Sequence, residues 1–311
     1  MRAVFVFAAV AALALAGCTK PVDFAPAVAT LAAGAKDAQS AFADLDAKAA
    51  QVERRIKLWR IAENRSPVTV EGGCNVASSG CALVAELDGS TLDLGAPLEK
   101  IAAKQIAILD ALVEYTQNLG ALAVADSKEE IDAQAAKISG AIAAVAALVP
   151  GGAPVAAIAP PVGNALAWLA GVARDRARLA VLREATAKMQ SVLARASHEL
   201  AESAQRLDTT LRREAIIEFE SNRAVWDRRA TVASLEKWIG SSVRLDALIK
   251  SNPSQSFDAL VNAHQALAEA LQNPPQDLAS LVKDLDRFAD LAKRAAKFAK
   301  EIREAANAAQ P

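Results

Sequence analysis

The sequence is poor in the side chains from which most catalytic and ligand-binding sites are built. It has only two histidines, three cysteines and one tyrosine among 311 residues, and aromatic residues make up 4% of the chain. Basic and acidic residues nearly cancel, at 35 against 36, so no net positive field attracts nucleic acid. The aromatic side chains are also too few to stack bases. We therefore expect no nucleic-acid partner.

Recognisable catalytic motifs are lacking as well. The chain has no Gly-rich phosphate-binding loop, no Gly-x-Ser-x-Gly elbow and no His-Glu-x-x-His zinc helix. Ser-x-x-Lys occurs at 234–237 and again at 280–283, but neither copy has the partner motifs of penicillin-binding enzymes. His198 and His264 lack metal-ligand spacing to the cysteines. We therefore expect a non-enzymatic protein without a metal or other cofactor; an undetected enzyme is an alternative.

The first residues have the pattern of a secretory signal. Met1-Arg2 is a short positive region, and the 14 residues of 3–16 are only Ala, Val, Phe and Leu. This run suits a signal-peptide core and is shorter than the roughly 20 residues that a spanning helix needs. It ends in Leu15-Ala16-Gly17-Cys18, which resembles the lipobox of bacterial lipoproteins. The residues alone also allow ordinary cleavage after Ala16, with Cys18 left as a free thiol.

The resemblance to bacterial lipoproteins implies that residues 1–17 are removed and that Cys18 is acylated on its thiol and on its new amine. Several acyl chains together anchor a protein stably to a lipid bilayer, which one chain does only marginally. Thr19 follows the cysteine where the inner-membrane signal of enteric bacteria has Asp, which implies the outer membrane. We expect residues 18–26 to form a tether and the protein to face the periplasm.

The other two cysteines form an even pair. Cys74 and Cys81 lie seven residues apart, and a disulfide is their expected state in an oxidising compartment. Such a bridge closes a short loop and stabilises by about 2–3 kcal/mol. A metal site is the alternative, but it would need further ligands.

Apolar side chains recur at alternating spacings of four and three through most of the chain. Residues 27–64 carry one such seam. Pro97 is predicted to open a second helix, and Ser127-Lys128-Glu129-Glu130 resembles a capping box that restarts it toward residue 149. A long helix is predicted from about 164 to 250.

Two further helices follow that long helix, with a breaker at 273–275 between them. Amphipathic helices joined by short connections favour an all-α fold. We predict that 27–311 forms an elongated antiparallel helical bundle with coiled-coil-like helices.

Residues 66–96 interrupt the helical pattern. Short β-like runs are bounded there by Gly and Ser, and Asp88-Gly89 marks a further turn. This segment is predicted to be a small β-hairpin clipped by the disulfide, inserted in the bundle as a chain-reversing connector. A recognition loop is the alternative role.

Residues 138–173 form an apolar hairpin without a single charge. A turn at 150–154 separates two arms, and each arm has 12 residues, which reach about 18 Å as helix against a hydrocarbon core of ~30 Å. The segment is therefore too short for a pair of transmembrane helices. It is either buried in the bundle or an oligomer, inserted in one membrane leaflet, or used as a docking site.

The residues predicted to contact a membrane or a partner belong to this segment and to the arginines after it. The arginines would meet lipid phosphates, or they form a solvated helix face. These candidate contact residues are Val145, Leu148, Val149, Pro150, Val155, Ile158, Leu166, Trp168, Leu169, Arg174, Arg176 and Arg178.

A long helix, an apolar Gly/Ala/Pro-rich hairpin and a second long helix follow one another over about 97–250. In architecture this plan resembles the cytolysin A and haemolysin BL class of helical pore-forming toxins. The resemblance implies that the apolar element folds against the bundle in the soluble form and enters a membrane later.

Taken together, the residues predict an envelope lipoprotein anchored in the bilayer through acylated Cys18. Its expected role is interaction, scaffolding or tethering, with a protein partner or as a homo-oligomer. The alternative is a membrane-active or pore-forming protein that uses residues 138–173.

Overall fold

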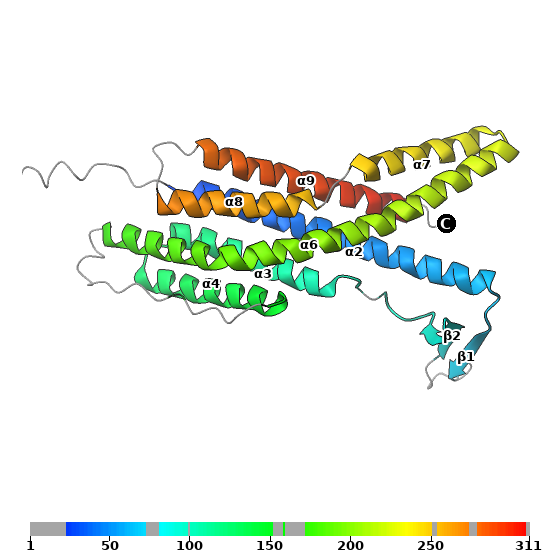
Figure 1. Cartoon of the computed structure of the whole chain (residues 1–311), viewed down its shortest axis with the longest axis horizontal. Helices are drawn as coiled ribbons and strands as arrows, with labels where there is room; N and C mark the ends of the chain where they lie inside the picture. Colours follow the sequence, from blue (N-terminus) through cyan, green and yellow to red (C-terminus); the bar gives the residue numbers. More distant parts are fainter. Residues whose placement is uncertain are drawn as a thin grey trace, which may run out of the picture.

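The computed structural model describes residues 23–72, 81–98, 100–151, 158, 172–250, 254–273 and 279–308. The chain is mostly helical, as predicted, with one small three-stranded antiparallel sheet (Figure 1). Its elements are α2 (Ala25–Glu63), β1 (Val68–Gly72), β2 (Cys81–Leu87), β3 (Ser90–Asp93), α3 (Ala103–Val124), α4 (Lys128–Leu148), α6 (Val172–Arg228), α7 (Val232–Lys250), α8 (Gln255–Gln272) and α9 (Ala279–Ala308).

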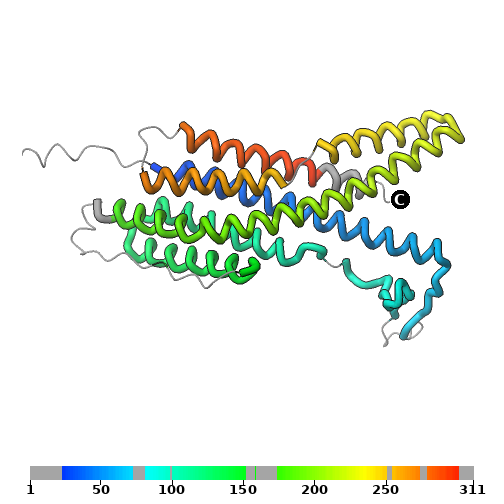
Figure 2. Tube along the Cα trace, in the orientation of Figure 1, coloured from blue at the N-terminus to red at the C-terminus, as the bar shows by residue number. Residues whose placement is uncertain are grey.

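The helices lie lengthwise against one another. Helix α2 packs along α9 and α3, while α6 contacts α2, α3, α4 and α8. We call the end where α2 begins the proximal end (Figure 2, left) and the opposite end, which holds the sheet and the α6–α7 turn, the distal end. Helices α3, α4 and α8 stop short of the distal end, where α6 and α7 project together as an arm (Figure 1).

The seam predicted for the first helix is the face that α2 buries. Leu31, Phe42 and Val52 are all buried in the main core. Burial of this seam in the main core stops toward the distal end, where Ile56 is only partly covered and Trp59 is 63% exposed. The heptad pattern continues in the sequence beyond the point where a neighbouring helix is present to cover it.

Helix α3 begins at Ala103 and not at Pro97, so the predicted start was wrong. Its first turn has no capping side chain of its own. Instead, the carboxylate of Asp46, a buried residue of α2, accepts a hydrogen bond from the Ala102 amide at 2.7 Å. Burial raises the pKa of Asp46, while the amides of Ala102 and Ile101 act in the opposite direction. A side chain distant in sequence therefore sets the start of this helix.

We expect Asp46→Ala to lower the free energy of unfolding by about 1–2 kcal/mol, because it leaves the Ala102 and Ile101 amides, just before α3, without their acceptor. Asp46→Asn keeps an oxygen that accepts a hydrogen bond, so it should lose less. Urea denaturation followed by circular dichroism measures both. Equal losses for the two variants would contradict the capping role.

The predicted helix from about 164 to 250 is two helices. The chain turns at 229–231 and α7 folds back along α6. Thr231 and Ser234 exchange side-chain and backbone hydrogen bonds at this turn, which caps the start of α7. The aromatic rings of Phe219 and Trp238 then meet, with centroids 5.9 Å apart. The Ser234 hydroxyl, which belongs to the first Ser-x-x-Lys match, is thus part of a helix cap.

The capping box predicted at Ser127 is confirmed. The Ser127 hydroxyl accepts from the Glu130 amide at 3.1 Å, and the Glu130 carboxylate accepts from the Ser127 amide at 3.3 Å. Helix α4 therefore begins at Lys128 because its first amides are satisfied locally.

The predicted β-hairpin is present and is extended by a third strand. Strands β1 and β2 pair antiparallel, with Val70 opposite Leu83, and β2 pairs with β3. Asp88 and Gly89 both have positive φ, 51° and 77°, which matches a tight two-residue turn. The sheet packs on Ile61 of α2.

Candidate interaction surface

The described part of the predicted apolar hairpin lies in the core. Val145 and Val149 are buried, Leu148 packs against the same cluster, and Pro150 is exposed at the end of α4. Ile158 is buried and its amide donates to the Ser139 hydroxyl at 2.9 Å. These positions match burial, the first of the three roles considered, and contact with lipid would require them to leave the core.

Helix α4 is also the one described helix whose length and composition would allow it to cross a membrane. Its buried face carries the large apolar side chains, among them Ile131, Ile138 and Ile142. A core helix of a soluble protein has the same composition, so this feature does not distinguish the two environments.

The arginine cluster divides between protein contacts and solvent. Arg174 pairs with Asp126 at 3.3 Å. Arg178 pairs with Asp175 at 2.5 Å and donates to the last carbonyls of α3, at Ala123 and Ala125. These two guanidinium groups join the start of α6 to the end of α3.

Arg176, by contrast, is exposed. It is therefore the only one of the three predicted arginine contacts that solvent reaches freely.

Several predicted site residues lie outside the described residues: Cys18, Cys74, Val155, Leu166, Trp168 and Leu169. Cys81 opens β2 opposite Gly72 and is disulfide-bonded. Its bond to Cys74 stays a prediction, since the position of Cys74 is not described.

Exposed large apolar side chains gather in the distal half of the described chain. Fourteen of the sixteen lie within 58–101 or 216–249, and the other two are Val124 and Val282. They occupy the end of α2, the sheet, the linker before α3, the end of α6, and α7 (Figure 1). Val232, at the start of α7, is 75% exposed. We define the fourteen residues within 58–101 and 216–249 as the distal apolar surface.

The cause of this surface is the unequal length of the helices. Large side chains of α6 are buried as far as Leu211, which lies beside Lys48 of α2 and Leu248 of α7, but Ile216 and Ile217 are exposed. Helix α7 packs chiefly on α6, and its Val232, Ile239 and Val243 side chains are exposed. In the sequence, the exposure of these apolar side chains corresponds to the loss of the heptad pattern after about residue 212.

A charge cluster fastens the α6–α7 arm to α2. Arg55 pairs with Glu214 at 2.7 Å, and Arg244 of α7 pairs with Glu218 at 2.5 Å. Lys48 lies within the same cluster, and burial lowers its pKa. These contacts join three helices where the arm leaves the rest of the protein.

Two hollows lie beside α6 on the distal side of the start of α3. The first, about 700 Å³, lies between α2, the start of α3 and α6. The second, about 600 Å³, is lined by α6 residues alone, from Gln205 to Ile217. Gln205 and Thr209 line both hollows.

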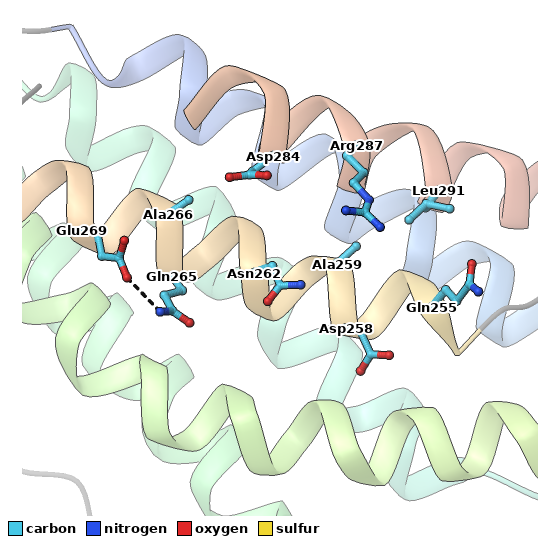
Figure 3. Close-up of a pocket in the computed structure, with 10 residues that line it drawn as sticks. All are labelled: Gln255, Asp258, Ala259, Asn262, Gln265, Ala266, Glu269, Asp284, Arg287 and Leu291. Atoms are coloured by element: carbon cyan, nitrogen blue, oxygen red, sulfur yellow. Dashed lines mark hydrogen bonds between the residues drawn. The ribbon is translucent and has the colours of Figure 1, made fainter. Parts of the chain in front are cut away.

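A third groove, of about 510 Å³, lies between α8 and α9 (Figure 3). Asp258 and Glu269 line it from α8, and Asp284 and Arg287 line it from α9. The Gln265 amide donates to Glu269 at 2.8 Å across one turn. The described lining contains no Ser, Cys, His or Lys.

The most deeply buried polar cluster links three helices. The Tyr115 hydroxyl of α3 donates to Nε2 of His264 on α8 at 2.8 Å, and His264 Nδ1 donates to Gln190 Oε1 of α6 at 2.6 Å. Burial raises the pKa of Tyr115 and lowers that of His264 to about 4. A neutral His264 makes both hydrogen bonds, one to Tyr115 and one to Gln190. The sequence analysis placed this histidine on an apolar seam.

Within the part of the chain that the structure describes, no three His, Cys, Asp or Glu side chains are placed to hold a metal ion. Comparison with protein-family models, with curated proteins and with solved structures gave no match for this chain.

Proposed function

We propose that the protein is a non-enzymatic lipoprotein of the bacterial envelope, anchored in the outer membrane by acylated Cys18 and facing the periplasm. It acts as a tether or scaffold: lipid holds the proximal end, and the distal apolar surface binds a partner. The observation that carries this proposal is the separation of the two ends. The tether joins α2 at the proximal end, whereas the exposed apolar side chains gather distally.

The helix lengths give such a tether its reach. Helix α6 has 57 residues, which correspond to about 85 Å at 1.5 Å per residue. We propose that its lengthwise packing with α2 and α9 forms an elongated antiparallel bundle with coiled-coil-like seams. The small sheet is clipped by a Cys74–Cys81 disulfide in this proposal, which the bonded state of Cys81 supports.

Cys18→Ser should release the protein from the membrane fraction or leave the signal uncleaved, because the acyl chains are its only proposed anchor. Cell fractionation and mass spectrometry of the mature N-terminus measure this. The wild-type N-terminus should be an acylated Cys18. An unmodified mature N-terminus upstream of Cys18 would contradict the lipoprotein assignment.

The distal surface is tested by photocrosslinking in cells. A crosslinking residue at Ile239, exposed on α7, should give a discrete adduct with an envelope protein. The matched position is Val282, which is exposed on α9 outside the distal surface. Adducts of equal yield at both positions would contradict the proposal that the distal apolar surface binds the partner.

The second candidate function is a membrane-active protein that uses residues 138–173, favoured by the length and composition of α4. Ala144 is exposed and Val145 is buried, so the structure separates two charge substitutions. Ala144→Asp should fold normally and abolish dye release from liposomes if α4 enters lipid. Val145→Asp should unfold the protein, since an unpaired buried charge costs several kcal/mol. Wild-type protein that releases no dye would exclude this function.

A further inference from the structure

Strand β1 forms one edge of the distal sheet. Among the described strands it pairs with β2 only, so one side of its backbone has no strand beside it, and all five of its residues are exposed. The other edge strand, β3, borders a hollow that Lys57 and Lys100 also line. Lysine beside a sheet edge hinders the addition of a further strand, and β1 contains no lysine.

The register of the sheet shows which backbone groups face this open side. The Leu94 amide donates to the Leu83 carbonyl at 2.7 Å, so the backbone groups of Leu83 face β3. Backbone groups alternate in direction along an antiparallel strand, so those of the next residue, Val84, face β1. Thr69 lies opposite Val84 and therefore turns its own N–H and C=O toward β2.

The outward-facing backbone groups of β1 consequently include those of its two valines. Val68 and Val70 flank Thr69, and their N–H and C=O groups point away from β2. Their side chains are 49% and 59% exposed and share a face with Ala85, which packs on Ile61 of α2. A strand added to β1 would therefore hydrogen-bond at the valines and continue this apolar face with its own side chains.

The opposite face of the sheet is acidic. Glu71 is the only charged residue of β1, and the alternation of side chains places Glu86 and Asp93 on the same face. All three are exposed, and the three described strands contain no Lys or Arg. A second copy of this sheet would add carboxylates to the acidic face, whereas a strand with basic side chains complements it.

We infer that β1 binds an extended segment of a partner protein in which apolar and basic residues alternate, added antiparallel as a fourth strand. Five residues of β1 give a paired length of about 17 Å. This inference rests on the proposed function, because it names the kind of segment that the partner presents to the distal end. It is measured by peptide binding to purified protein, whereas the crosslink at Ile239 is measured in cells, so failure of one is distinguishable from failure of the other.

The probe is a labelled synthetic peptide of seven residues in which Val and Lys alternate, with Val at both ends. In the antiparallel arrangement its valines lie opposite Val68 and Val70, so its valine amides face β1. Two control peptides of equal charge carry N-methyl groups, one on its two inner valine amides and the other on two lysine amides. Fluorescence anisotropy with the mature protein in non-ionic detergent should show saturable binding, kept by the lysine-methylated peptide and at least tenfold weaker for the valine-methylated peptide.

Charge variants test the acidic face. Wild-type protein should bind the Val/Lys peptide about fivefold more tightly than a peptide with Glu in place of Lys. Glu71→Lys should abolish this preference. Glu236→Lys makes the same charge change at an exposed position of α7 and should keep the preference.

Val70→Pro tests the edge itself. It removes one outward N–H and leaves the hydrogen bonds to β2, so the protein should keep its circular dichroism spectrum and bind the peptide at least fivefold more weakly. Absence of saturable binding, equal affinity for the two methylated peptides, or wild-type preference in Glu71→Lys would each overturn the inference. A dimer of the protein alone that Val70→Pro dissociates, seen by analytical ultracentrifugation, would also overturn it, because a second copy would then occupy the edge.

Discussion

Lowering the pH from 7.5 to 5 should reduce the free energy of unfolding by about 2 kcal/mol through His264 alone. Burial lowers the pKa of this histidine to about 4 in the folded protein, whereas an unfolded chain holds it near 6.5. The unfolded state therefore binds a proton that the folded state excludes. This contribution to stability is complete above pH 6.5 and is lost progressively as the pH falls toward 4.

The physical cause is the cluster around the ring. Tyr115 donates to one ring nitrogen and Gln190 accepts from the other, so neither partner is a carboxylate that would stabilise a charged imidazolium. Desolvation therefore determines the direction of the pKa change.

Urea denaturation at several pH values measures the effect. His264→Gln removes the titrating group, so the loss between pH 7.5 and 5 should shrink by about 2 kcal/mol relative to wild type. His198 is exposed beside Glu202, and His198→Gln serves as the matched control. The same pH dependence in wild type and His264→Gln would show that this histidine is not buried as described.

Gly34→Ala should destabilise the protein by about 2 kcal/mol, although alanine is the better helix former. A Cβ atom at Gly34 would lie 2.5 Å from Cε1 of Phe288, which belongs to α9. The Phe288 ring is fully buried and has no free space into which to move. The overpacking therefore exceeds the gain of up to about 1 kcal/mol in helix propensity.

Gly140→Ala, in the middle of α4, is the matched substitution, because a Cβ atom there meets nothing within 4 Å. It should stabilise by about 0.5–1 kcal/mol through helix propensity alone. Thermal or urea unfolding of the two variants should therefore give changes of opposite sign. A stabilising Gly34→Ala would contradict the close packing of α2 on α9.

The candidate surface was only partly predictable. Residues 138–173 stood out in the sequence because they lack charge, yet Val145 and Val149 lie in the core. The exposed apolar residues of the distal end, such as Ile217 and Val232, occur among charged residues, where composition gives no signal. Their exposure depends on which helices are present alongside them.

Local patterns in the sequence determined the helical class, the capping box at Ser127 and the turn at Asp88-Gly89, because each depends on residues within a few positions of one another. The heptad seam predicted the buried face of α2 as far as Val52.

Tertiary structure decided the rest. Helix α3 starts at Ala103, where Asp46 of α2 accepts a hydrogen bond from the preceding amide. Helices α6 and α7 separate at a turn that no proline or glycine marks. The distal surface stays open because α3 and α8 do not extend to it (Figure 1). Each of these outcomes depends on contacts between segments distant in sequence. Such contacts are set by how the helices pack and how far each extends, which local periodicity does not encode.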